Sequence, residues 1–283
     1  MVLGVLLLIL GAITAVARWV SRHPDRVRAW TNRQLNRPRI LVLRRRYRIQ
    51  LAFLLRRVSP EEAFGLSLTI GLILLVLCGW AFGEVLDAVI DREEVAALDS
   101  PVTSWLVAHR TPLLTVIMKV VTQLGGLWVL APLLTIVGLV AALRYRQTDA
   151  PGFLAASSLG TAALVAAIKL LIARPRPRIG AIVATYGGYA FPSGHSAQAV
   201  AAYAALAFLI ARSVGSWRRR VIVWAAAVML AAVIGFSRLY LGAHWLTDVL
   251  GGFAIGGAWL ALLVTTWTTY RHRRRARSQR SPS

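Results

Sequence analysis

The sequence predicts an all-α fold, a polytopic membrane helix bundle with a six-helix core and one additional N-terminal helix. Hydrophobic residues make up 57% of the 283 residues. Several uninterrupted apolar segments approach about 20 residues, the length that an α-helix needs to cross about 30 Å of hydrocarbon. Charged residues are only 16% of the chain and lie mostly between these segments. A membrane bundle therefore accounts for most of the chain.

The N-terminal run VLGVLLLILGAITAVA is predicted to form a short helix of its own. No basic residue precedes it and a basic stretch follows it at once, so it differs from a cleaved secretory signal. A helix that lies in the membrane interface is the alternative. Residues 1–57, which also include the arginine-rich stretch from Arg18 to Arg57, are expected to form a separate N-terminal segment.

Six membrane spans are predicted to follow, within a core of residues 58–270. Each is a long apolar segment, and polar or charged residues separate it from the next. The expected spans are residues 62–83, 127–143, 152–173, 195–212, 221–237 and 247–269. The remaining residues, 271–283, are strongly basic and are expected to be a disordered tail near anionic lipid.

The arginines predict the orientation of the bundle in the cell membrane. The formal net charge is +22, and under six-span alternation the arginine-rich segments all fall on one side, which the positive-inside rule makes cytoplasmic. The acidic segment 84–111 and the connections 174–194 and 238–246 fall on the other side, the periplasm or exterior. Anionic lipid headgroups are the expected partners of the cytoplasmic arginines. Nucleic acid is not expected, because the arginines separate apolar spans.

One extracytoplasmic connection begins with arginines that the positive-inside rule does not explain. The stretch KLLIARPRP starts at Lys169 and includes Arg174 and Arg176. A lysine within a span is costly unless it faces an interior or a water-filled cavity, or extends to the interface. The two Arg-Pro pairs end the helix, because proline disfavours helical geometry in the residue before it. Anchoring at the interface is the alternative interpretation of these cations.

A second motif, Pro192-Ser193-Gly194-His195, opens the apolar helix that runs to about Arg212. Ser193 is suited to cap this helix, and Gly194 lets a ligand approach the backbone closely. The free N–H groups and the positive end of the helix dipole favour an anion. His195 is therefore predicted to stand at the mouth of an anion site, although a capping serine alone is common.

A third motif, SRLYLGAHWLTDVLGG, covers residues 237–252. His244 and Asp248 are four residues apart, so on a helix that begins near Gly242 or Ala243 they share a face. The carboxylate then accepts a hydrogen bond from one ring nitrogen and orients the histidine. A satisfied polar pair at the membrane interface is the alternative interpretation.

The alternation of spans places all three motifs on the same outer face. Together they supply two histidines, one carboxylate, a helix N-terminus and three cations, namely Lys169, Arg176 and Arg238. This set is typical of phosphoryl chemistry, in which cations and backbone donors hold the phosphate oxygens, one histidine attacks phosphorus and another protonates the leaving oxygen. No acidic cluster suited to magnesium accompanies them, and Cys78 is the only cysteine, so no metal or other cofactor is expected.

These motifs resemble the three-part pattern of the type 2 phosphatidic acid phosphatase (PAP2) superfamily, K-x6-R-P, P-S-G-H and S-R-x5-H-x3-D. Every position and spacing is present, and the resemblance extends over about residues 58–270. It implies that His244 is a nucleophile that forms a phosphohistidine, that Asp248 orients it and that His195 protonates the leaving group. It also implies phosphate binding by Lys169, Arg176, Ser193, Gly194 and Arg238. Arg174 and Arg178 lie off the pattern and are expected to contact lipid or its headgroup.

The function expected from the resemblance is metal-independent hydrolysis of a lipid phosphate or diphosphate at the extracytoplasmic face. Undecaprenyl diphosphate, phosphatidic acid and phosphatidylglycerol phosphate carry the same headgroup chemistry, so the motifs do not choose among them. A transporter or scaffold is one alternative, but it would place polar groups near mid-membrane in several spans. A vanadate-dependent haloperoxidase has a similar motif but is soluble, unlike this chain.

Overall fold

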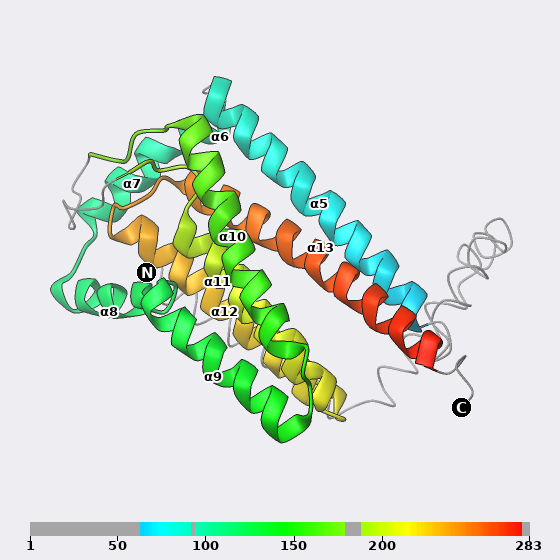
Figure 1. Ribbon diagram of the computed structural model, residues 1–283. Coiled ribbons are helices and arrows are strands. Elements are labelled where there is room, and N and C mark those ends of the chain that lie inside the picture. The colour runs from blue at the N-terminus through cyan, green and yellow to red at the C-terminus, as the bar shows by residue number, and fades with distance from the viewer. Residues whose placement is uncertain (1–62, 92–93, 179–187, 279–283) are drawn as a thin grey trace, which may run out of the picture. The chain divides into compact units, whose positions relative to one another are not determined.

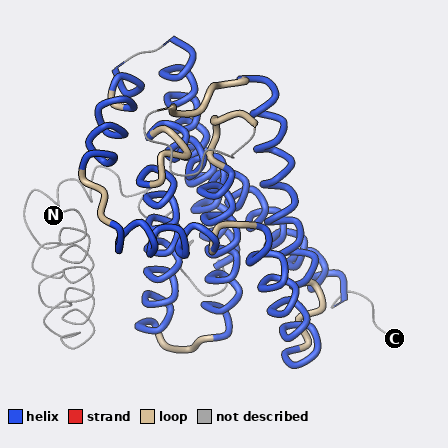
Figure 2. The backbone as a smooth tube through the Cα atoms, turned by 90° about the vertical axis from the view of Figure 1, so that its left-hand side faces the viewer, coloured by secondary structure: helices blue, strands red, loops and turns tan. Residues whose placement is uncertain are grey.

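A computed structural model describes residues 63–91, 94–178 and 188–278 of the chain. These ranges contain helices and loops without a strand, as Figure 2 shows, which confirms the predicted all-α class. The helices are α5 (Ala63–Asp91), α6 (Glu94–Ala97), α7 (Asp99–Ala108), α8 (Pro112–Gln123), α9 (Leu127–Tyr145), α10 (Ala150–Ile172), α11 (Gly194–Ser213), α12 (Trp217–Tyr240) and α13 (Leu246–Ser278). The predicted N-terminal helix and residues 1–57 lie outside the described residues.

Six helices in the described ranges are long and apolar enough to cross a membrane, and they coincide with the six predicted spans. They are Leu68–Asp91, Leu127–Tyr145, Ala150–Ile172, Gly194–Ser213, Trp217–Tyr240 and Leu246–Arg274. Large apolar side chains on them, such as Val76 and Leu143, are exposed on the protein surface, as lipid-facing residues are. The chain is therefore a multi-pass membrane protein.

The last helix corrects the predicted boundary of the disordered tail. α13 continues as helix to Ser278, so residues 271–278 are helical, where the sequence analysis expected disorder. Arginine and alanine are good helix formers, and Arg271 is held by an ion pair of 3.4 Å between its Nη1 and Asp149 Oδ2. Residues 279–283 lie outside the described part of the chain.

Residues 67–213 and 223–283 form one compact unit, which holds all three motifs. The other unit, residues 1–66 and 214–222, is described only in part. There Arg220 Nε donates a hydrogen bond of 2.8 Å to the carbonyl of Val214 just before α12 begins.

Within the larger unit, α11 packs against α13 and α10, and α10 packs against α9 (Figure 1). Small residues permit the closest of these contacts. A Cβ on Gly256 of α13 would lie 2.5 Å from the carbonyl oxygen of Ala197, and one on Gly252 would lie 2.6 Å from that of Ser193. Glycine at these positions lets the two backbones approach, as in other membrane helix pairs. The start of α11 is thereby held against the first turns of α13.

The segment between α5 and α9 contains three helices that the sequence analysis did not predict. α6 and α7 contact α13, and Figure 1 shows them at the end of the bundle where α10 ends. α8 begins with Pro112 in its first turn, and the hydroxyl of Thr111 accepts a hydrogen bond of 3.4 Å from the amide of Leu114. This N-cap and proline combination is a common helix start.

Candidate active site

The three motifs meet where four long helices end. α10 and α12 contribute their C-terminal ends, and α11 and α13 contribute their N-terminal ends. Ala173 adopts a left-handed conformation with φ 48° after α10, and its amide donates to the carbonyl of Lys169 at 3.0 Å. The chain then leaves the helix through the Arg-Pro pairs, as predicted.

His244 and Asp248 form the predicted contact, at a slightly different position in the helix. α13 begins at Leu246, not near Gly242 or Ala243, so His244 precedes the helix. Its Nδ1 nevertheless lies 3.3 Å from Asp248 Oδ2. The same oxygen accepts a hydrogen bond of 2.9 Å from the amide of Trp245. Asp248 therefore caps α13 and fixes the imidazole with one carboxylate.

The contacts of His244 define its tautomer. Arg176 Nη1 lies 3.3 Å from His244 Nε2, and a guanidinium can only donate hydrogen bonds. Nε2 is therefore the acceptor, and Nδ1 carries the proton that faces Asp248. An unprotonated Nε2 that points away from the orienting carboxylate is the arrangement needed for nucleophilic attack.

Burial keeps the His244 imidazole neutral. The residue is 2% exposed, and burial lowers the pKa of His244 from 6.5 to about 4. The hydrogen bond and charge of Asp248 oppose this change, whereas the charges of Arg238 and Arg176 add to it. The imidazole is consequently uncharged at neutral pH and available as a nucleophile.

The three predicted cations all reach this site. Arg176 is fixed by hydrogen bonds from Nη1 to the carbonyl of Ala243 at 2.9 Å and from Nε to that of Gly188 at 3.1 Å. Arg238, 1% exposed, donates from Nη1 to Thr122 Oγ1 at 2.7 Å. Lys169 donates to the carbonyls of Tyr189 and Ala190. The positive charges are thus held in place by neutral partners, with Arg238 buried and Lys169 and Arg176 half-buried.

Ser193 caps α11, as the sequence predicted. Its hydroxyl accepts hydrogen bonds from the amide of Ser196 at 3.4 Å and from the Ser196 hydroxyl at 2.9 Å. The Ser193 amide donates to the carbonyl of Asp248 at 2.8 Å, which joins the second motif to the third. Gly194 follows as the first residue of the helix, where free amides favour an anion.

His195 lies beside these groups. It is within electrostatic range of Lys169, Arg176, Arg238 and His244. A turn that the sequence analysis did not single out lies against it, since a Cβ on Gly126 would be 3.6 Å from His195 Nε2. The structure therefore brings the predicted site residues together, with two histidines and three cations within electrostatic range of one another.

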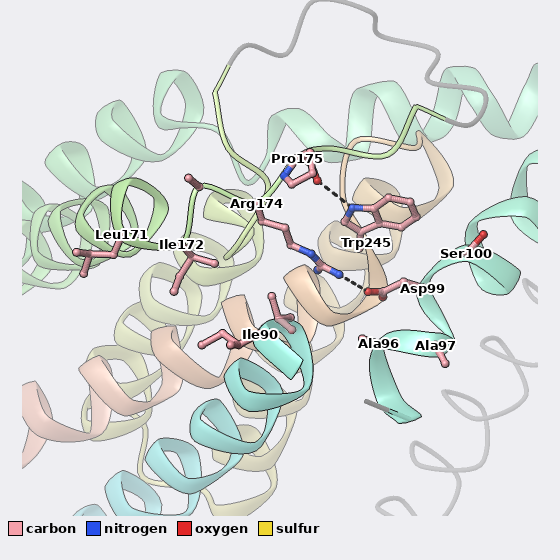
Figure 3. A pocket seen from close by; sticks show the side chains of 12 residues that line it. Ile90, Ala96, Ala97, Asp99, Ser100, Leu171, Ile172, Arg174, Pro175 and Trp245 are labelled. Carbon is pink, nitrogen blue, oxygen red and sulfur yellow. Dashed lines mark hydrogen bonds and ion pairs between the residues drawn. The ribbon is translucent and has the colours of Figure 1, made fainter. Parts of the chain in front are cut away.

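The expectation that Arg174 contacts lipid is wrong. Its Nη1 lies 2.7 Å from Asp248 Oδ1. Its Nη2 lies 2.7 Å from Asp99 Oδ2, a contact that Figure 3 shows. Both carboxylates are buried, so Arg174 neutralises charge inside the protein instead of meeting headgroups. Arg178, by contrast, is exposed. Sequence reasoning missed Arg174 because the motif spacing does not include it, and it missed Asp99 because that residue belongs to an acidic segment far from the motifs.

A cavity of about 870 Å³ opens beside this ion pair. Figure 3 shows Arg174 and Asp99 pointing toward each other at its edge, with Trp245 next to them. The other side chains around it are mostly apolar, including Ile90, Leu171 and others from α5, α6 and α10. A space with an apolar lining and few polar groups is suited to part of a lipid.

Chemically, the arrangement is suited to phosphoryl transfer. Cations lie around a neutral, oriented histidine, and a second histidine lies within electrostatic range of it, which are the groups that such a reaction needs. In the described ranges no group of three or more His, Cys, Asp or Glu side chains is arranged to hold a metal ion. Cations are the groups here that can neutralise a phosphate.

Comparison with known proteins gives consistent matches. Residues 151–273 match the PAP2 superfamily. The phosphatidylglycerophosphatase B of Bacillus subtilis (strain 168) is 34% identical over 177 residues, which is 62% of this chain and 86% of that protein. The lipid A 1-phosphatase of Rhizobium etli is 42% identical over 73 residues, which is 26% of this chain and 27% of that protein.

A solved structure is similar over most of the chain. The crystal structure of a transmembrane PAP2 type phosphatidylglycerolphosphate phosphatase from Bacillus subtilis superposes with a TM-score of 0.63 and 28% sequence identity. The match covers 68% of this chain and 96% of that one. The likeness thus includes the bundle as well as the motifs.

Proposed function

The chain belongs to the PAP2 superfamily, and its named relatives are lipid phosphatases, so we propose that it hydrolyses a lipid phosphate or diphosphate through a phosphohistidine intermediate. The observation that carries this proposal is the state of His244, whose Nε2 is an acceptor while Nδ1 faces Asp248. The charged groups of the site also lie at one end of the helices, which favours an enzyme over a transport pathway.

In the first step, the phosphate occupies the space between the three cations and the N-terminus of α11. Lys169, Arg176, Ser193, the Gly194 amide and Arg238 hold its oxygens. Nε2 of His244 attacks phosphorus, so that a P–N bond forms while the bond from phosphorus to the leaving oxygen breaks. His195 gives its proton to that oxygen, and Asp248 stabilises the positive imidazole.

In the second step, a water molecule replaces the leaving group. His195, now neutral, takes a proton from the water, whose oxygen attacks phosphorus. The P–N bond breaks, inorganic phosphate leaves and both histidines return to their starting states. The cations take the place that a metal ion has in many phosphoryl-transfer enzymes, because they stabilise the charge of the transition state.

The substrate class follows from the relatives and from the cavity beside Arg174. The similar protein and the similar solved structure from Bacillus subtilis both carry phosphatidylglycerophosphatase names, and the Rhizobium etli relative is a lipid A 1-phosphatase. Phosphatidylglycerol phosphate is therefore the first substrate to test, with phosphatidic acid and undecaprenyl diphosphate beside it. The positive-inside pattern supports a site at the periplasm or exterior, where the headgroup of an outer-leaflet lipid is accessible.

The test measures phosphate release from these three lipids by the purified protein in detergent with EDTA. We expect turnover of at least one lipid, no measurable turnover by His244→Ala, and normal turnover by His109→Ala. His109 is a matched control because it is an exposed histidine that stacks on Trp105 and does not belong to any of the three motifs. An acid-labile phosphoenzyme should form in the wild type and in His109→Ala but not in His244→Ala. Loss of activity in EDTA, or equal activity of the two variants, would contradict the proposal.

A further inference from the structure

Asp99, the first residue of α7, makes a buried polar network with residues far away in the sequence. It is 4% exposed. Its Oδ1 accepts a hydrogen bond of 2.9 Å from the amide of Thr247. Its Oδ2 accepts one of 2.6 Å from the Thr247 hydroxyl and one of 2.7 Å from Arg174 Nη2. Asp99 lies outside residues 151–273, which match the family, so the family match assigns it no role.

The first of these contacts fixes the beginning of α13. The first amides of a helix have no partner within it and need an acceptor from elsewhere. Asp248 supplies one for the amide of Trp245, and Asp99 supplies one for the amide of Thr247. Asp99 thus caps from another helix the same turn that carries Asp248, and α7 contacts α13 accordingly.

The contact of Asp99 with Arg174 affects both the orientation and the charge of Asp248, because Arg174 also binds that carboxylate. Arg174 Nη1 binds Oδ1 of this carboxylate, while His244 Nδ1 and the Trp245 amide face Oδ2. With donors on both oxygens the carboxylate cannot rotate. Arg174 alone would cancel the charge of Asp248, but its second partner, Asp99, restores one net negative charge to the group of three. That charge stabilises the imidazole when it becomes positive.

We propose that Asp99 and Arg174 are positioning residues of the active site, which act through Asp248 on His244. This inference rests on the proposed phosphatase function. Neither side chain needs to touch the phosphate, which the residues of the three motifs hold. Both side chains also line the cavity beside them, but their polar atoms are engaged by partners inside the protein. Their loss is therefore expected to slow the chemical step more than it weakens substrate binding.

Asp99→Asn is the first variant to test, with Asp91→Asn as its control. Both changes remove one negative charge from the same acidic segment, but Asp91 is exposed at the end of α5. Asp99→Asn should lower kcat by roughly 10–100-fold, the loss typical when a residue that orients a metal-binding side chain is removed. KM should stay within about twofold of the wild-type value. Asp91→Asn should leave both unchanged. Size-exclusion chromatography and thermal unfolding show whether each variant is folded.

Arg174→Gln and the double variant Asp99→Asn/Arg174→Gln test whether the two residues act together. Arg174→Gln leaves two buried carboxylates without their shared cation, so its kcat should be lower than that of Asp99→Asn. Removing one of those carboxylates relieves the excess charge, so the double variant should regain at least several-fold in kcat over Arg174→Gln. Lys119→Gln, which removes an exposed positive charge from α8 outside the three motifs, should be neutral. Independent structural losses would multiply instead, and that result would overturn the inference.

Thr247→Val probes the network without a change of charge. It removes the hydroxyl that donates to Asp99 and accepts from Arg174, and it should lower kcat by a smaller factor than Asp99→Asn does. Wild-type kcat in folded Asp99→Asn and Thr247→Val would refute the positioning role while the proposed function stands.

The proposed function is judged separately, by the wild type. If the wild type hydrolyses none of the lipids, the proposed function fails. The network is then tested by orthovanadate, which binds a nucleophilic histidine in the geometry of the transition state. Weaker vanadate binding by Asp99→Asn than by Asp91→Asn would support the inference, and equal binding or none would overturn it.

Discussion

Asp248→Asn should almost abolish turnover, although it changes only one oxygen to an NH₂ group. Asp248 is fully buried and accepts hydrogen bonds on both oxygens. Oδ1 faces Arg174 Nη1 at 2.7 Å, and Oδ2 faces the amide of Trp245 at 2.9 Å and His244 Nδ1 at 3.3 Å. Arg174 and the amide can only donate. Either orientation of the asparagine therefore places its NH₂ group against a donor.

The asparagine is expected to keep its oxygen against the charged Arg174 guanidinium, which places its NH₂ group at the Oδ2 position, toward His244. With NH₂ at the Oδ2 position, the imidazole can accept from this group only if its proton moves to Nε2, which then cannot attack phosphorus. That N–H would face the Arg176 guanidinium, and the Trp245 amide would still face the NH₂ group, so the substitution also disturbs the packing around His244. The same substitution in a Ser-His-Asp triad, where it produces the wrong tautomer, lowers kcat by about 10⁴-fold. We expect a loss of that order, which corresponds to about 5 kcal/mol in the barrier.

The assay is phosphate release under saturating lipid, with single-turnover labelling to follow the phosphoenzyme. Asp248→Asn should form the phosphoenzyme slowly. It should still bind vanadate in part, because the cations are unchanged. Asp149→Asn is a suitable control, because Asp149 pairs with Arg271 near the start of α10 and lies outside the three motifs. A folded Asp248→Asn protein that retains more than about a tenth of wild-type kcat would refute the tautomer argument.

Three further predictions concern stability and topology. The pKa of His244 is lowered to about 4 in the folded protein, so between pH 4 and the ordinary pKa of 6.5 the unfolded chain binds an extra proton. The midpoint of thermal unfolding should therefore fall as the pH drops through this window. The fall should be smaller in His244→Gln, which lacks the titrating group. Gly252→Ala should lower that midpoint, because its Cβ would lie 2.6 Å from a backbone oxygen, whereas Gly79→Ala, with nothing within 4 Å, should not; equal midpoints would contradict the close packing of α11 and α13. Single cysteines at Arg178 and Ser216, in a background without the native cysteine, should be labelled and protected, respectively, by an impermeant maleimide on intact cells, and the reverse pattern would invert the topology.

Most of the site was predictable because the residues of each motif lie only a few positions apart in the sequence. A separation of four positions from His244 to Asp248 is enough to bring their side chains together, even though α13 begins later than expected. The cap at Ser193 is local as well. The six spans were predictable because length and apolar character decide them almost alone.

The positioning network was not predictable, because its contacts are not local. Asp99 is 75 residues from Arg174 and 148 from Thr247. In the sequence it is one acidic residue among several in the segment 84–111, and the short helices of that segment carry no long apolar run. Only the packing of α7 on α13 distinguishes its carboxylate from exposed ones such as Asp91. The same lack of local signal led to the wrong interpretation of Arg174.

The alternation of the spans also explains why this end of the bundle suits a phosphate. Lys169 and Arg238 lie in the last turns of α10 and α12, where the negative end of a helix dipole favours a cation. Asp248 lies in the first turn of α13, where the positive end favours a carboxylate. The remaining positive end, that of α11, has a serine cap and a glycine but no acidic residue in its first turn. Each side chain charge is thus matched to its own helix, and the N-terminus of α11 is the one among these four ends left to bind a substrate anion.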